Sequence, residues 1–184
     1  MNLTLAQLSQ ARAQWKWRGQ ERPPFAVKPS ADQISVWDFP RPPEIVRENR
    51  EIIVMWGKLE VARTNASWVV RETSHPPTFY IPMSNVKIAL LQSAGDGSFC
   101  EWKGPAKYWH LVSNSDKLSS VAWSYPSPLS GAEQLAECIA FYAKDLDCWV
   151  GGAKVKPQGG GFYGGWITPD LAGPFKGDPG SGGW

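Results

Sequence analysis

The sequence has few cysteines, and they are not spaced as metal ligands. The three, Cys100, Cys138 and Cys148, are an odd number and include no C-x-x-C pair. This argues against a disulfide framework and against a zinc site built on thiolates. We therefore expect a protein of the reducing cytoplasm that uses no metal and no cofactor. Cys100 has no nearby histidine or helix start to activate it, so we expect an inert or only lightly reactive thiol.

The chain also lacks a strong net charge and a long apolar run. Lys and Arg number 19 and Asp and Glu 17, which gives a formal net charge of +2. So small an excess does not predict a nucleic-acid-binding surface. No segment approaches the roughly 20 apolar residues that cross a bilayer, and the N-terminus has no apolar stretch typical of a signal peptide. We expect neither nucleic acid nor a membrane among the partners.

Tryptophan is abundant. The chain has 184 residues, of which 42% are hydrophobic, and 11 are Trp. This length suffices for one domain with a sizeable core plus appendages. Because Trp offers a large apolar area and one N–H donor, the count indicates a small core built on rings, a ligand cage, or both.

Residues 1–33 are predicted to form an N-terminal amphipathic helical extension. Four apolar residues recur at steps of three and four: Leu5, Leu8, Ala11 and Trp15. This spacing places them on one face of a helix, and Pro23 and Pro24 prevent its continuation. The apolar face would pack on the domain or on a partner, including a second copy of the chain. A loosely attached leader is the alternative.

Residues 34–167 are predicted to form one mainly antiparallel β domain with minor helices. Two apolar runs, 52–56 and 59–62, flank Gly57-Lys58 and predict a hairpin. Further strands are expected at 68–71, 78–81, 107–112, 119–124, 139–142 and around a Gly151-Gly152 turn. About eight short strands without regular βαβ alternation favour a closed, barrel-like or tent-like sheet, which would hide its edges.

Two other segments carry local signals. Ser84 is a suitable N-cap for a short helix over residues 84–91. Residues 168–184 are rich in Gly and Pro, so we expect a disordered tail there. The preceding run at 159–166 contains aromatic rings, which we expect to dock on the domain.

Rigid proline corners bring candidate polar groups next to rings. His75 lies in the motif ETSHPP, three residues after Glu72, so the two are a candidate acid/base pair. The alternative is that Ser74 and His75 only hydrogen-bond the corner that Pro76 and Pro77 make rigid.

Lys103 lies between Trp102 and Gly104 and is a candidate to stabilise negative charge on a ligand or in a reaction. A solvated turn lysine is the alternative. Five further residues are candidates to bind a ligand. Arg41 is a second cation, and four aromatic rings would form the walls of the cleft: Trp37, Trp102, Trp123 and Tyr125.

Five segments in order carry a family resemblance: VWDFPRPP at 36–43, ETSHPP at 72–77, CEWKG at 100–104, AWSYP at 122–126 and AFY at 140–142. This succession closely resembles the family of domain of unknown function 427, which has also been filed as nucleotidyltransferase-like. The resemblance implies a small β-tent domain, similar to methionine sulfoxide reductase B and the cereblon drug-binding domain, with a cleft rimmed by the Trp, His and Lys motifs. Those relatives carry zinc on two C-x-x-C pairs, which this chain lacks.

Three functions follow as hypotheses. The first is a domain that binds a small anionic or aromatic, nucleotide-like ligand in an aromatic cleft. The second is an enzyme, possibly nucleotidyltransferase-like, with Glu72 and His75 as acid and base and Lys103 stabilising negative charge. The third is a protein-interaction module that uses the N-terminal helix and the tail.

Overall fold

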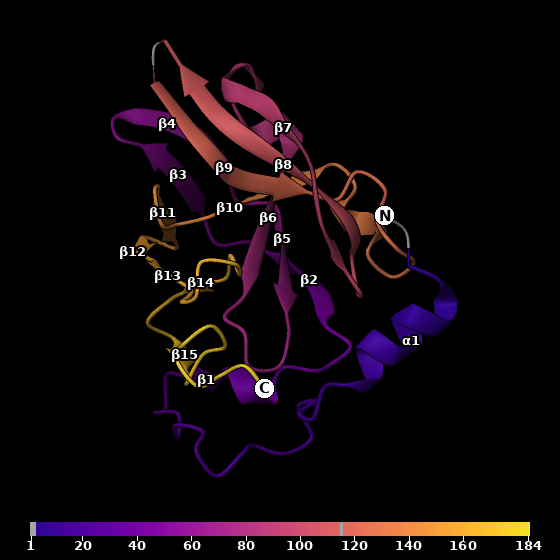
Figure 1. The fold of residues 1–184 in the computed structure, drawn as a ribbon. Coiled ribbons are helices and arrows are strands. Elements are labelled where there is room, and N and C mark those ends of the chain that lie inside the picture. The colour runs from indigo at the N-terminus through magenta and orange to yellow at the C-terminus, as the bar shows by residue number, and fades with distance from the viewer. Residues whose placement is uncertain (1–2, 115) are drawn as a thin grey trace.

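The computed structural model describes residues 3–114 and 116–184. The fold is mainly antiparallel β-structure, and one α-helix, α1 (Leu5–Ala13), lies at one side of the sheets (Figure 1). The strands are β1 Ile34–Ser35, β2 Glu44–Glu48, β3 Ile52–Trp56, β4 Leu59–Thr64, β5 Ser67–Arg71, β6 Thr78–Pro82, β7 Leu91–Cys100, β8 Gly104–Ser113, β9 Asp116–Ser124, β10 Cys138–Phe141, β11 Asp147–Val150, β12 Ala153–Lys154, β13 Lys156–Pro157, β14 Trp166–Ile167 and β15 Leu171–Ala172. Short 3-10 turns are Val36–Asp38, Met83–Asn85, Ile88–Leu90 and Glu133–Leu135. The predicted β class is therefore confirmed.

Two antiparallel sheets contain most of the described strands, and the parallel pair β1–β15 and the antiparallel pair β13–β14 are separate two-stranded sheets. The larger has the strand order β2-β5-β6-β10-β9-β8-β7, and the smaller has the order β12-β11-β3-β4. The predicted hairpin around Gly57-Lys58 is confirmed as β3–β4. Within the described residues, β2 and β7 are the outer strands and do not pair with each other, so the large sheet is open. The closed barrel among our expectations is therefore wrong.

The main core joins the two sheets. Phe79 and Ile81 of β6, with Phe141 of β10, are buried against Val54 and Val61 of the smaller sheet. Side chains alternate along a strand, so the residues between these positions must project from the opposite face.

That opposite face holds a second cluster. Tyr80, Trp123 and Ala140 occupy the intervening positions of β6, β9 and β10. Ala140 lies directly opposite Trp123 in the sheet register. The aromatic rings of this face form the floor of the cavity described below.

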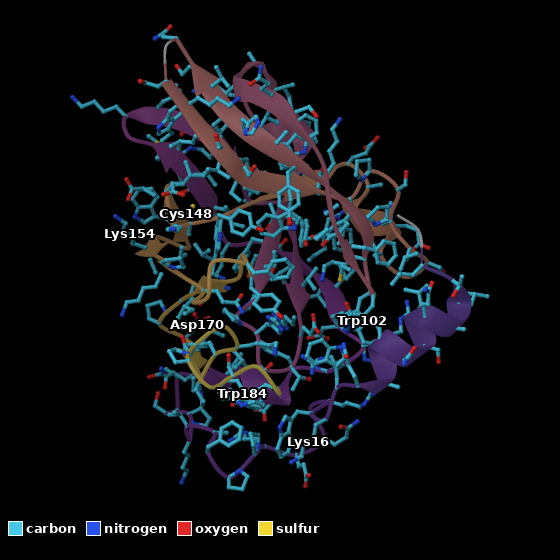
Figure 2. The ribbon with its side chains drawn as sticks, in the orientation of Figure 1. Lys16, Trp102, Cys148, Lys154, Asp170 and Trp184 are labelled. Atoms are coloured by element: carbon cyan, nitrogen blue, oxygen red, sulfur yellow. The ribbon has the colours of Figure 1, made fainter. Side chains whose placement is uncertain are left out.

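A third cluster joins the two ends of the chain. Trp37 is completely buried and donates its indole N–H to the Pro174 carbonyl at 3.1 Å. Trp184 stacks on Phe25 with ring centroids 5.1 Å apart, and the C-terminal segment lies beside β1 (Figures 1 and 2). Residues 168–184, for which composition predicted disorder, are packed in this structure because aromatic rings anchor them despite their glycines.

The N-terminal segment also differs from the expected amphipathic helix. A capping box between Thr4 and Gln7 starts α1, but Leu5 is 87% exposed and only Leu8 of the helix is buried. The segment is held instead by Trp15 and Trp17, which follow the helix.

The helix expected at residues 84–91 is replaced by two 3-10 turns and the start of β7. Val86 forms a bridge with Ala62, and the Lys87 N–H donates to the Val61 carbonyl at 2.9 Å. These contacts pair the backbone of Val86 and Lys87 with β4. A continuous helix would instead need those backbone groups for its own hydrogen bonds. Within the described residues, no helix is long and apolar enough to cross a membrane.

Trp37→Ala should lower the free energy of unfolding by about 3–5 kcal/mol, because it removes a fully buried indole at the junction of both chain ends. Urea denaturation of the full chain measures this change. Ile88→Ala, at a side chain that is 51% exposed, is the control and should change it by less than about 0.5 kcal/mol. Equal effects of the two substitutions would contradict the assignment of Trp37 to the core.

Candidate functional site

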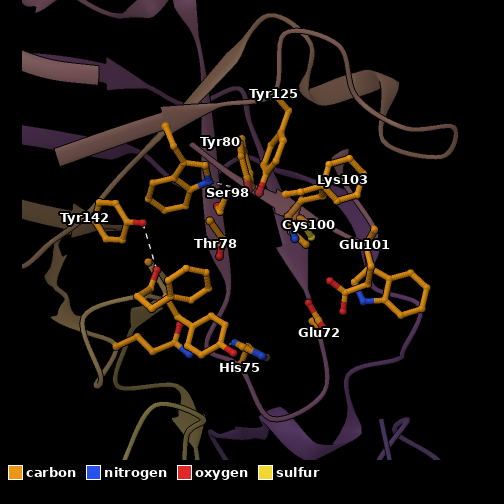
Figure 3. Close-up of a pocket in the computed structure, with 18 of the residues that line it drawn as sticks. Glu72, His75, Thr78, Tyr80, Ser98, Cys100, Glu101, Lys103, Tyr125 and Tyr142 are labelled. Atoms are coloured by element: carbon orange, nitrogen blue, oxygen red, sulfur yellow. Dashed lines mark hydrogen bonds between the residues drawn. The ribbon is translucent and has the colours of Figure 1, made fainter. Parts of the chain in front are cut away.

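A cavity of about 170 Å³ lies on the ring-bearing face of the large sheet (Figure 3). Its walls come from four parts of the chain: the sheet itself, the 72–77 corner, the turn between β7 and β8, and the 158–164 segment. Trp15 of the N-terminal segment completes the lining. Segments distant in the sequence therefore converge on one hollow.

Aromatic rings with hydroxyl groups form the floor. The Trp123 indole N–H donates to the Tyr80 hydroxyl at 3.3 Å, and the Trp123 ring lies 4.5 Å from that of Tyr142. Burial raises the pKa of Tyr80 to about 12 and raises the pKa of Tyr125 well above its ordinary value. Both phenols therefore stay protonated at neutral pH and offer O–H donors beside apolar ring faces.

The turn between β7 and β8 supplies the cation. Cys100 pairs with Gly104 in the hairpin register, so the three residues between them form the turn and Lys103 returns beside Cys100 (Figure 3). Gly104 has φ of +100° and lies against Leu129, a position that favours glycine. The turn thus places a thiol and an ammonium next to each other in the cavity wall.

Lys103 is held in its charged form. Burial opposes its charge, but Cys100, Tyr80 and Glu72 raise its pKa above the ordinary value. Among the ion pairs of the described residues, none involves Lys103. The cavity therefore contains a cation without a carboxylate bound directly to it.

The 72–77 corner supplies Glu72 on another wall. Arg41, which is only 3% exposed, donates from Nε to Glu72 Oε1 at 3.0 Å. The same guanidinium donates to the backbone carbonyls of Trp17 and Thr73. Arg41 does not line the cavity, so the Glu72 carboxylate that does line it is compensated by a cation outside the lining.

His75 belongs to a separate hydrogen-bond network. Gln158 accepts from the Gly165 N–H at 2.9 Å through its oxygen, so its NH₂ group must face the Lys176 carbonyl and His75 Nδ1, at 2.7 and 3.0 Å. Nδ1 is therefore an acceptor, and neutral His75 carries its proton on Nε2. Burial, together with Arg41, Lys103 and Lys176, lowers the pKa of His75 well below 6.5.

The cavity is covered by the 158–164 segment. The Tyr142 hydroxyl donates to the Phe162 carbonyl at 3.2 Å, and the Tyr163 ring meets His75 edge-on at 4.6 Å. Gly164 lies so close to the Trp123 ring that a Cβ there would overlap it. The docking of rings expected for 159–166 is therefore confirmed, and the covering segment fits only with glycine at position 164.

Trp15 closes the opposite rim. Its indole N–H donates to Glu101 Oε1 at 2.7 Å, and the centroid of its ring lies 4.4 Å from the Arg41 guanidinium and 5.1 Å from the Lys176 ammonium. Arg12 donates to the Glu101 carbonyl at 2.9 Å. The N-terminal segment is thereby fixed against the cavity mouth by hydrogen bonds and cation–π contacts.

The structure brings together six of the eight residues predicted from the sequence: Glu72, His75, Trp102, Lys103, Trp123 and Tyr125. Trp37 lies in the third cluster, and Arg41 lies behind Glu72, so neither lines the cavity. Although Glu72 and His75 share the cavity, their side chains bind Arg41 and Gln158 rather than each other in the described hydrogen bonds.

Sequence reasoning missed several lining residues: Trp15, Tyr80, Cys100, Tyr142, Gln158 and Tyr163. Alternation along β6 was the available signal for Tyr80. Trp15 was assigned to a helix face, and nothing local linked it to Glu101. Among the described residues, no group of three His, Cys, Asp or Glu side chains could hold a metal ion.

Comparison with protein families gives one finding. A family model described as a domain of unknown function (DUF427) matches residues 44–152. No curated protein matches the chain. The matched segment contains the β7–β8 turn and the ring-bearing strands, whereas Trp15 and the 158–164 cover lie outside it.

Replacing His75 should flatten the pH dependence of stability. Its folded-state pKa lies below the unfolded value of about 6.5, so protonation favours the unfolded chain. Neutral His75 contributes stability that is present above pH 6.5 and is lost as the pH falls towards the folded-state pKa.

The free energy of unfolding, measured from pH 7.5 to 5.5, should therefore fall more steeply in the wild type than in His75→Gln. Ile88→Ala, at a half-exposed side chain without a titratable group, is the control and should keep the wild-type slope. A His75→Gln curve parallel to the wild type would show that His75 is not held neutral.

Proposed function

The chain belongs to the DUF427 family, and we propose that its cavity binds a small organic anion that carries a single ring or a group of similar size. The observation that carries this proposal is Lys103, a charged side chain in a ring-lined cavity with no carboxylate of the described chain paired to it. A carboxylate or phosphate on a ligand would supply the counter-charge and accept its hydrogen bonds.

The other charged groups of the lining support an anion over a cation. Glu72 is already bound by Arg41, and Glu101 accepts the indole N–H of Trp15. His75 is neutral, with its remaining proton on Nε2, and so adds a donor and no charge. The tyrosine hydroxyls and Lys103 are then the groups positioned to receive an acceptor-rich ligand.

Size restricts the ligand. The volume of about 170 Å³ is below the roughly 300–1,000 Å³ typical of pockets for drug-sized ligands, and resembles an engineered cavity of roughly 150 Å³ that binds benzene. One ring with a carboxylate fits this scale. A whole nucleotide does not, although a second hollow of about 570 Å³ adjoins the first and shares Tyr108, Tyr142 and Tyr163 with it.

Isothermal titration calorimetry with benzoate, benzamide and adenosine monophosphate tests this proposal. Benzoate should bind more tightly than the neutral benzamide, and Lys103→Met should weaken benzoate binding by about 10- to 100-fold, the usual worth of a charged hydrogen bond. Lys58→Met, at an exposed lysine of the β3–β4 turn, is the control and should leave the affinity unchanged.

Equal affinities of the wild type and a folded Lys103→Met variant for benzoate would refute the anion site. Tighter binding of adenosine monophosphate than of benzoate would refute the single-ring limit and extend the ligand into the second hollow.

A further inference from the structure

Cys100 differs from the other two cysteines in its surroundings. Its side chain is partly exposed and lines the cavity (Figure 3), whereas Cys138 and Cys148 are buried in the apolar clusters. Burial raises the pKa of Cys138 to about 11 and also raises the pKa of Cys148. Since the thiolate is the reactive form of cysteine, these two thiols are poor nucleophiles and serve as internal references.

The turn holds Cys100 and Lys103 in a fixed relation. Cys100 is the last residue of β7 and pairs with Gly104, the first of β8, so Glu101, Trp102 and Lys103 form a short, closed turn. The Leu129 N–H donates to the Lys103 carbonyl at 3.1 Å and secures this turn from outside the hairpin. A ligand anion on Lys103 would therefore lie within reach of the Cys100 sulfur.

Two further features lie in the same wall. The Trp102 indole N–H is buried and has no acceptor among the described residues, while the ring itself is only 9% exposed and lines the cavity. The Lys103 ammonium has no carboxylate bound to it. A buried donor without an acceptor is costly, whereas the half-buried Lys103 ammonium beside Cys100 takes part in none of the described ion pairs and so can pair with an anion.

We propose that Cys100 is a covalent modification site for small carboxylates that carry an electrophilic carbon next to the carboxylate. Lys103 binds the carboxylate, and the sulfur attacks the adjacent carbon. A sulfur–carbon bond forms, the bond from that carbon to its leaving group breaks, and the leaving group departs with the electron pair. The thiol proton passes to solvent, and the product is a thioether.

This inference rests on the proposed anion site but adds a nucleophile to it. Binding at Lys103 converts an encounter in solution into a reaction between neighbouring groups, which raises the rate without any change in the intrinsic chemistry of the thiol. The sign of the charge on the electrophile should therefore decide the rate at Cys100 and have no such effect at Cys138 or Cys148.

Alkylation by iodoacetate and iodoacetamide tests this on the full chain. The two reagents have the same leaving group and differ in charge, and mass spectrometry of peptides measures the rate at each cysteine. Cys100 should be alkylated first, with iodoacetate at least as fast as iodoacetamide. Lys103→Met should lower the iodoacetate rate at Cys100 by about tenfold and change the iodoacetamide rate much less, whereas Lys58→Met should alter neither.

Reaction of all three cysteines at similar rates, or an iodoacetate rate at Cys100 that Lys103→Met leaves unchanged, would overturn the proposal. Titration of Cys100→Ser with benzoate separates this outcome from the anion site itself. If benzoate still binds to this variant while Cys100 of the wild type is unreactive, the nucleophile alone is refuted. If benzoate binds neither protein, the anion site is refuted as well.

Discussion

The alternation of side chains along three neighbouring strands determines where the site lies. Phe79, Ile81 and Phe141 must face the smaller sheet to complete the main core, so the residues between them face the other way. Tyr80 and Trp123 consequently leave the core side and form a second aromatic layer. A register slip of one residue would exchange the two layers, so core packing and cavity floor are specified by the same constraint.

The cover of this layer depends on Arg41. Its buried guanidinium joins the Trp17 carbonyl, the Thr73 carbonyl and the Glu72 carboxylate, and it lies over the Trp15 ring. Burial lowers its pKa while Glu72 opposes that effect, as expected of a charge compensated by its surroundings. One residue thereby fixes the N-terminal segment and the proline corner together, and the family-matched part supplies a floor that the flanking segments close.

The sequence predicted best what nearby residues determine. The β3–β4 hairpin follows from Gly57-Lys58 between two apolar runs, and the convergence of Glu72, His75 and Lys103 follows from corners that end strands. Contacts between segments distant in the sequence could not be predicted from local patterns. The hydrogen bond between Trp15 and Glu101 spans 86 residues. The bridge between Val86 and Ala62 forms in place of the helix that Ser84 was expected to cap. Trp37 was misjudged because a ring among prolines has the same local pattern in a core and in a cleft wall.

The electrostatics of the cavity follow from how each charge is compensated. Glu72 has Arg41 behind it, and His75 is kept neutral by burial and three neighbouring cations. Burial opposes the charge of Lys103, but Cys100, Tyr80 and Glu72 raise its pKa, and none of the described ion pairs occupies it. In a low-dielectric enclosure such a cation attracts an anion more strongly than it would on the surface. The fold thus leaves one charge in the cavity outside the described ion pairs, next to the thiol of the same turn.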